Sequence, residues 1–207
     1  MFLPFVKNKL DLNHWILFFL WIFYCVIHST LATAKVKSIF EKASGKFFRY
    51  YRLAYTIFAA VTLLLILYFQ YSFASPALIN QSTIKYISFV IFVLPGLIIM
   101  MISILKYFKL LSGVRSLFEG NLPTELQKKG IHRYVRHPLY SGTLLFIWGL
   151  FFIFPMVNNL IAVGVITGYV LIGIRLEEKK LLIEFGNLYK DYISEVPMLI
   201  PDFTDLK

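Results

Sequence analysis

Long uncharged apolar runs, separated by short polar segments, set the pattern of this chain. Three of these runs have 20 to 22 residues each and lie at residues 15–34, 53–74 and 86–105. An α-helix rises about 1.5 Å per residue, so each run can cross a hydrocarbon core of about 30 Å. Pro95 and Gly96 lie in the middle of the third run. They predict a kink, because proline removes a helical hydrogen bond.

Two shorter runs follow at residues 139–154 and 160–174, with Pro155 and Asn158-Asn159 between them. At about 1.5 Å per residue they reach about 23 Å. We interpret them as a short helical hairpin that only just crosses the bilayer or stops short of its far side. The whole pattern predicts an all-α integral membrane protein with about five transmembrane helices, in a single membrane domain over residues 1–207.

The tail of the chain has a different pattern. Apolar residues recur there at the i, i+3, i+4, i+7 spacing of a helix with one apolar stripe. They are Phe185, Leu188, Tyr189, Tyr192, Ile193 and Val196. Pro197 should end this helix. We expect an amphipathic cytosolic tail helix that lies along the membrane interface or covers something there.

Composition strengthens the membrane interpretation. Apolar residues make up 58% of the 207 residues and charged residues only 15%, against roughly 25% charged in soluble domains. The mean hydropathy is +0.71. These values exclude a disordered chain, a collagen-like fibre and a soluble DNA-binding domain. Cys25 is the only cysteine, so an intrachain disulfide is excluded.

The placement of the basic residues predicts the orientation of the chain in the membrane. Three segments of one predicted side, residues 35–52, 106–137 and 175–207, contain 18 of the 21 lysines and arginines. The other side has Lys7, Lys9 and Lys85. The positive-inside rule then places the N-terminus outside and the tail in the cytosol. The net charge of +10 therefore indicates membrane topology and predicts no nucleic-acid partner.

A signal peptide is the alternative interpretation of the N-terminal region. Lys7 and Lys9, the first apolar run and Ala32-Thr33-Ala34 imitate a secretory signal with its cleavage site. Cleavage would place the basic segments outside, against the positive-inside bias. The apolar run is also longer than a usual signal segment.

Candidate chemistry gathers where the predicted hairpin begins and ends. Arg136-His137-Pro138 opens the fourth helix, and proline fits the first helical position. Free N–H groups at a helix start attract anions, and arginine adds a bidentate fork. The polar residues of this region are Arg136, His137, Tyr140, Arg175, Glu177 and Glu178. The hairpin brings them together at the cytosolic end of the bundle, which we call the mouth. Such a site suits a zwitterion, for example an amino acid moiety.

The alternative for this region is structural, because arginine and glutamate often mark helix ends at the interface. Glu177 and Glu178, followed by two lysines, could form a solvated face. His28 lies inside the first run, where ionisable groups are rare and often functional. We favour the alternative interpretation, a neutral histidine that is hydrogen-bonded to a neighbouring helix.

The remaining histidines and the cysteine predict no metal site. We interpret Cys25 as a packing residue, and His14 and His132 as surface residues. Four scattered histidines and one cysteine do not form a metal-ligand cluster. The glycine fingerprints of nucleotide-binding loops are also absent from the sequence.

An ordered set of motifs in the last third of the chain carries a resemblance. The motifs are Arg136-His137-Pro138-Leu139-Tyr140-Ser141-Gly142, then Glu177-Glu178, then Phe185-Gly186-Asn187-Leu188-Tyr189-Lys190-Asp191-Tyr192, then Val196-Pro197. Together they resemble the isoprenylcysteine carboxyl methyltransferase and phospholipid methyltransferase superfamily of membrane enzymes, which use S-adenosylmethionine (SAM). The ending, Val196 to Pro201, is most similar to the bacterial branch that includes methanethiol S-methyltransferases.

The resemblance implies a SAM site built from the first motif, the hairpin and the paired glutamates. It implicates as cofactor-binding residues Tyr134, Arg136, His137, Tyr140, Gly142, Glu177 and Glu178. Arg136 or a helix end would hold the methionine carboxylate, and Glu178 the ammonium. Arg175 and Glu178 are the residues expected to act in the reaction, Arg175 by orienting the acceptor. No catalytic base is implied.

The resemblance thus implies a SAM-dependent methyltransferase in a bacterial cytoplasmic membrane. Its expected acceptor is a small or lipid-borne nucleophile, with a thiol in first place. A phospholipid amine and a prenylcysteine carboxylate are the alternative acceptors. A membrane sterol-type reductase that uses NADPH is a second class of enzyme, and a non-catalytic protein on the same scaffold is a third hypothesis.

Overall fold

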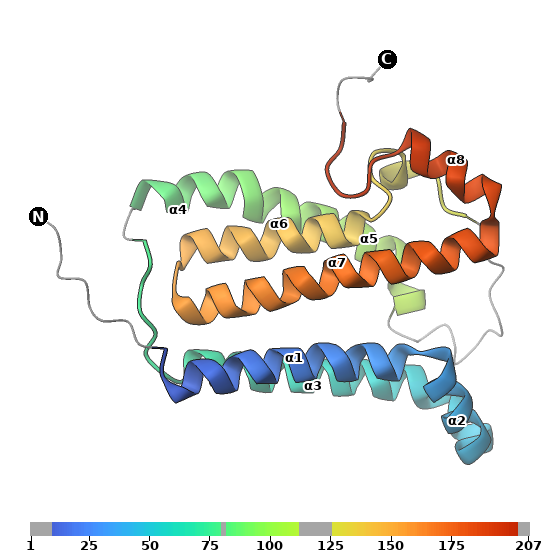
Figure 1. Cartoon of the computed structure of the whole chain (residues 1–207), viewed down its shortest axis with the longest axis horizontal. Helices are drawn as coiled ribbons and strands as arrows, with labels where there is room; N and C mark the ends of the chain where they lie inside the picture. Colours follow the sequence, from blue (N-terminus) through green and yellow to red (C-terminus); the bar gives the residue numbers. More distant parts are fainter. Residues whose placement is uncertain (1–9, 80–81, 112–125, 203–207) are drawn as a thin grey trace, which may run out of the picture.

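The computed structural model describes residues 10–79, 82–111 and 126–202, and in these ranges the chain is all α-helical without a strand (Figure 1). The helices are α1 (Leu12–Ala32), α2 (Ala34–Ser44), α3 (Tyr51–Tyr71), α4 (Ser82–Ser88), α5 (Leu94–Leu111), α6 (Pro138–Ile153), α7 (Val157–Phe185) and α8 (Asn187–Glu195). Short 3₁₀ turns at Gly45–Tyr50 and Gly130–Arg133 and a π-helical turn at Phe89–Val93 complete the order.

Four helical stretches in the described part of the chain are long and apolar enough to cross a membrane. They are Leu12–Ala32, Ala34–Tyr71, Ile84–Lys106 and Val157–Phe185. Helix α6 is apolar but has only 16 residues. The prediction of an all-α, multi-pass membrane protein is confirmed, with four long apolar stretches and one shorter apolar helix.

Helix α7 is longer than the apolar run that predicts it. The run ends at Ile174, but the helix continues to Phe185. The residues after the run are mainly leucine, glutamate and lysine, which favour helix, so the helix can continue beyond the apolar layer. Gly186, with φ of 53°, ends it. Glu177 and Glu178 therefore lie inside a helix, and not at its exit.

Helices α6 and α7 form the expected hairpin, and the other long helices pack around it. Helix α5 packs against α6, and α1 packs against both α3 and α7 (Figure 1). The α1–α3–α7 contact has an apolar core of Leu17, Trp21, Ile66 and Ala162. The chain passes back and forth along one bundle axis. As a result, the start of α6 and the last turns of α1 and α7 lie toward the end of the bundle that carries α8.

The crossing of α5 and α6 is a contact of backbone on backbone. A side chain at Gly96 would meet the carbonyl oxygen of Gly142 at 2.9 Å, and one at Gly142 would meet the amide nitrogen of Met100 at 2.9 Å. Small residues allow membrane helices to approach this closely. Pro95 lies just after the π-helical turn Phe89–Val93, which widens the helix where proline would crowd it.

The opposite end of the bundle has a buried polar network. Gln70 accepts a hydrogen bond from the indole of Trp21 at 3.0 Å and donates to Asn159 at 2.8 Å, which ties α1, α3 and α7 together. The prediction that His14 is a surface residue is wrong, because it is only 3% exposed. Its ring bonds to the cap residue Asp11 at 2.6 Å and to Ser75 at 3.1 Å.

Candidate active site

The start of α6 lies against the C-terminal segment 196–199. The amide of Arg136 donates to the carbonyl of Pro197 at 2.9 Å, and the amide of His137 donates to that of Met198 at 3.2 Å. The hydroxyl of Ser141 donates to the carbonyl of Leu199 at 2.7 Å. The predicted anion site is therefore smaller than expected, because the tail already occupies the two amides that precede the helix. The first-turn amides of α6 remain, since no side chain caps this helix.

Arg136 and Glu178 form a mostly buried ion pair. The Nε and Nη2 atoms of Arg136 are both 2.8 Å from Oε1 of Glu178. The two side chains are 9% and 18% exposed. Nη1 of Arg136 donates to the carbonyls of Ile193, at 3.3 Å, and Val196. The two residues that were expected to hold opposite ends of a zwitterion are thus paired with each other.

His137 and Tyr189 complete the arrangement around the same carboxylate. Nε2 of His137 is 3.1 Å from Oε1 of Glu178, and its Nδ1 is 3.9 Å from Oε2 of Glu177. The phenol of Tyr189 donates to Oε1 of Glu178 at 3.4 Å. Burial raises the pKa of Tyr189, so the phenol stays protonated and can donate. We call Arg136, His137, Glu177, Glu178 and Tyr189 the mouth cluster.

Helix α8 covers the mouth cluster with its apolar face. Gly186 has a positive φ and lets the chain turn back from α7. Tyr189, Tyr192 and Val196 are then buried and pack against residues of α7 and against Leu126. The phenol of Tyr192 also donates to the carbonyl of His132 at 2.6 Å. The amphipathic tail helix is confirmed, and it covers a site rather than lying free.

Glu177 is the most accessible carboxylate of the mouth cluster, with 45% of its side chain exposed. The ring of Tyr140 lies beside that of His137, with 5.7 Å between the ring centroids. The structure thus places Tyr140, Glu177 and the buried pair in one region. An exposed carboxylate next to buried polar groups can bind a cationic ligand group from the aqueous side.

Three other residues singled out by the sequence lie apart from this region. Gly142 lies at the α5–α6 crossing, where its missing side chain serves helix packing. Tyr134 is 46% exposed in the turn before α6. Arg175 is exposed on α7 and, among the described residues, forms no ion pair with the mouth cluster.

An apolar cavity of about 410 Å³ lies among the helices, further from the α8 end of the bundle than the mouth cluster. Side chains from α1, α3, α5, α6 and α7 line it, and the lining includes His28, Met100, Thr143 and Tyr169. Thr143 follows Tyr140 by one turn of α6, and Met100 lies at the Gly142 crossing. The cavity therefore reaches toward the first turn of α6 and can hold an uncharged molecule.

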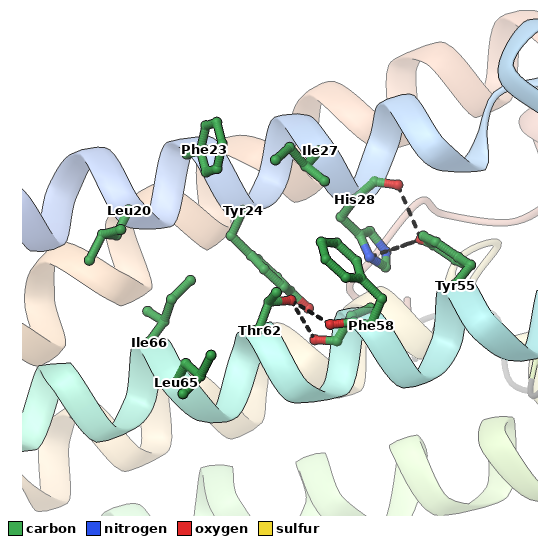
Figure 2. Close-up of a pocket in the computed structure, with 11 residues that line it drawn as sticks. Leu20, Phe23, Tyr24, Ile27, His28, Tyr55, Phe58, Thr62, Leu65 and Ile66 are labelled. Atoms are coloured by element: carbon green, nitrogen blue, oxygen red, sulfur yellow. Dashed lines mark hydrogen bonds between the residues drawn. The ribbon is translucent and has the colours of Figure 1, made fainter.

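His28 lies in the wall of this cavity and bonds to the neighbouring helix α3. The hydroxyl of Tyr55 is 2.9 Å from Nδ1 and 3.0 Å from Nε2 of His28, and it donates to the His28 carbonyl at 3.1 Å (Figure 2). The interpretation of His28 as a residue hydrogen-bonded to a neighbouring helix is confirmed. Within the described ranges, no group of three or more metal-ligating side chains occurs.

Sequence reasoning missed how the tail is used. Tyr189 and Val196 were part of an apolar stripe, yet Tyr189 also donates to Glu178, and the carbonyl of Val196 accepts from Arg136. The tail motif contains Tyr189, so the sequence offered a signal for this tyrosine. Every residue has a backbone carbonyl, so the sequence carries no signal for the contact between Arg136 and the carbonyl of Val196.

Comparison with known proteins places these motifs in a family. The model of the phospholipid methyltransferase family matches residues 84–187, half of the chain, and this segment includes α6 and α7. A methanethiol S-methyltransferase of Crocosphaera subtropica is 28% identical over 86% of this chain and 71% of its own length. No solved structure matches the chain.

Two further relatives match shorter parts of this chain. A methanethiol S-methyltransferase of Mycobacterium tuberculosis is 36% identical over 44% of this chain and 38% of its own length. One of Pseudomonas deceptionensis is 33% identical over 51% of this chain and 41% of its own length. The chain therefore matches less than half the length of these two relatives. On the family match over half of its residues, the chain belongs to the phospholipid methyltransferase family.

Proposed function

We propose that this protein is an integral membrane enzyme that transfers the methyl group of SAM to a small thiol. The family is one of methyltransferases, and the relatives described above are named methanethiol S-methyltransferases. The observation that carries the proposal is that α6 and α7 carry residues of the mouth cluster and, about two turns further along each helix, side chains that line an apolar cavity. This arrangement offers a polar site for a cofactor from water and an apolar site for an uncharged acceptor.

The residues of the mouth fit the amino acid part of SAM. Glu177 is exposed enough to accept hydrogen bonds from the ammonium group. The first-turn amides of α6, at Leu139 and Tyr140, can donate to the carboxylate. Arg136 and Glu178 would act mainly by holding the tail and His137 in place. This assignment moves the ammonium from Glu178 to its exposed neighbour.

Two exposed residues extend this proposal beyond the mouth cluster. Tyr134 offers an aromatic face beside the start of α6 for the adenine ring. Arg175 lies two residues before Glu177 on α7 and could orient an acceptor that carries a negative charge. Both assignments follow the resemblance of the motifs, and both residues are exposed.

Methyl transfer from SAM needs alignment more than acid–base chemistry. When bound, SAM supplies an electrophilic methyl group on a sulfonium sulfur. The chain has to hold the acceptor in line with that group and to exclude water, and well-oriented pairs gain about 7–11 kcal/mol in this way. Helix α8 covers the mouth, and apolar side chains line the cavity below it. Together they provide the dry, fixed environment that this displacement requires.

A parallel assay tests the proposed function. Purified protein in detergent receives labelled SAM with methanethiol, phosphatidylethanolamine or a farnesylated cysteine. We expect label in dimethyl sulfide and little in the other two products. Turnover with only the phospholipid or the prenyl cysteine would contradict the thiol assignment. The phospholipid amine is the second candidate, because the family is described by phospholipid methylation. The family match gives no support to the reductase alternative.

The chain is further proposed to cross the membrane five times, with its N-terminus outside and its tail in the bacterial cytosol. The bundle supports this count, because α6 follows the other long helices back across it (Figure 1). The basic asymmetry of the sequence supports the direction. We expect reporter fusions after Lys46, Lys128 and Lys207 to show a cytosolic signal. A cytosolic signal after Gln81 would contradict this topology.

A further inference from the structure

His28 occupies a position between two hollows of the bundle. It lines the central cavity of about 410 Å³ and also a groove of about 210 Å³ between α1 and α3. Tyr24 is the other side chain that lines both. Figure 2 shows His28 and Tyr24 pointing from α1 toward α3, above Phe58 and Thr62. An apolar molecule in the groove would therefore meet His28 before it reaches the cavity.

The hydrogen bonds of His28 leave one ring nitrogen with a lone pair. The Tyr55 hydroxyl has one hydrogen and gives it to the carbonyl oxygen of His28 at 3.1 Å. The hydroxyl oxygen then accepts from the N–H of the neutral imidazole. Both ring nitrogens lie within 3.0 Å of this hydroxyl, but a neutral imidazole has only one N–H, so the other nitrogen keeps its lone pair. Neutral histidine held in this way can accept a proton.

The side chains that face His28 contain no charge. Tyr55 comes from α3, Tyr24 and Cys25 from α1, and Tyr169 from α7, with 6.4 Å between the ring centroids of His28 and Tyr169. Neither hollow has a lysine, an arginine or a carboxylate among its described lining residues. A thiol in such an apolar site stays protonated, because burial disfavours the thiolate. The reactive form of a thiol is the thiolate, so the site needs a proton acceptor.

His28 also lies at a suitable depth for the reaction. Its neighbour Ser29 donates to the phenol of Tyr169 at 3.0 Å. Tyr169 precedes Glu177 by about two turns of α7, or roughly 12 Å along the helix. An extended methionine chain spans about 6–7 Å from its ammonium nitrogen to its methyl carbon. The acceptor sulfur, at about 3–3.5 Å from that carbon, and its contact with His28 fill most of the remaining distance. A thiol at His28 would therefore lie on the bilayer side of a SAM molecule that is anchored at the mouth.

We propose that the acceptor thiol binds in the central cavity with its sulfur against His28, and that His28 is the general base of the reaction. The inference rests on the proposed function. The S–H proton moves to the unprotonated ring nitrogen of His28, and the sulfur forms a bond to the methyl carbon. The bond between that carbon and the sulfonium sulfur breaks, and its electron pair stays on the departing sulfur. The products are a thioether, S-adenosylhomocysteine and an imidazolium that later releases its proton.

Two thiols of different acidity test this role. Methanethiol is protonated at neutral pH, whereas 4-nitrothiophenol is already ionised and needs no base. In His28→Gln we expect the rate with methanethiol to fall by about 10²- to 10⁴-fold, the usual contribution of a general base. We expect the rate with 4-nitrothiophenol to fall by less than about tenfold. The measured quantity is the ratio of the two rates in the variant against that in the wild type.

Two controls separate this role from others. SAM affinity of His28→Gln, measured by calorimetry, should equal that of the wild type and so show a folded cofactor site. Cys25→Ala changes the same cavity wall one turn away without removing a base, so it should leave the rate ratio unchanged. Equal losses with both thiols in His28→Gln would overturn the proposal and indicate a structural histidine. Wild-type protein that methylates neither thiol would instead refute the proposed function itself.

Discussion

Arg136→Ala should reduce the affinity for SAM by at least about 100-fold. Among the described residues, the arginine is the only lysine or arginine within hydrogen-bond distance of the Glu178 carboxylate, and the pair is mostly buried. Removing one partner of a buried pair typically destabilises the structure around it by about 3–5 kcal/mol. SAM binding would have to restore the order of the mouth, and the same free energy taken from binding is more than 100-fold in a binding constant. The variant also loses the bonds from Nη1 to the carbonyls of Ile193 and Val196. Calorimetric titration with SAM in detergent measures the effect.

Glu178→Gln should have a smaller effect. Arg136 keeps its two carbonyl partners in this variant, and the amide oxygen of glutamine can still accept from Nε. Arg136→Lys should not restore binding, because a lysine lacks the planar fork that reaches the carboxylate and two carbonyls at once. Lys179→Ala, at an exposed position next to Glu178, is the matched control and should bind SAM normally. Unchanged affinity in both Arg136→Ala and Glu178→Gln would place the cofactor site elsewhere.

The helices could be predicted from sequence because the membrane imposes a simple pattern. Each long apolar run became a helix, since a helix satisfies all its backbone groups within the lipid. The end of α7 could not be predicted in this way. Hydropathy reports where a segment leaves the apolar layer, whereas the helix continues until Gly186 changes the backbone. His14 was misplaced for a related reason, because its burial depends on Ser75, sixty-one residues away.

Part of the candidate site could likewise be predicted from the sequence, and part could not. The proximity of Arg136, His137 and the paired glutamates could be predicted, because a helical hairpin returns the chain to the end of the bundle where the hairpin begins. It could not show that Arg136 and Glu178 are each other's partners. That pairing depends on the rotation of α7 about its axis, which places Glu178 inward and leaves Glu177 half exposed. The choice between the two carboxylates for the ammonium therefore required side-chain geometry.

A stop after Glu195 should abolish methyl transfer. This truncation removes four carbonyls that accept hydrogen bonds from the start of α6, at Val196, Pro197, Met198 and Leu199. One of these bonds is charged and three are neutral, so their combined net value is about 3–7 kcal/mol. The truncation also removes the buried side chain of Val196 from the apolar face that holds α8 in place. The mouth would lose its cover, and water would reach the reacting groups.

The matched control is a stop after Asp202, which leaves every one of these four carbonyls in the chain. It should bind SAM and turn over like the full chain. Both truncations are compared by SAM affinity and by thiol methylation in the same detergent. Thermal unfolding of each variant shows whether the bundle itself survives. The bundle core lies among α1, α3 and α7, so we expect a folded protein without a working mouth. Full activity after the stop at Glu195 would show that the tail is no part of the site.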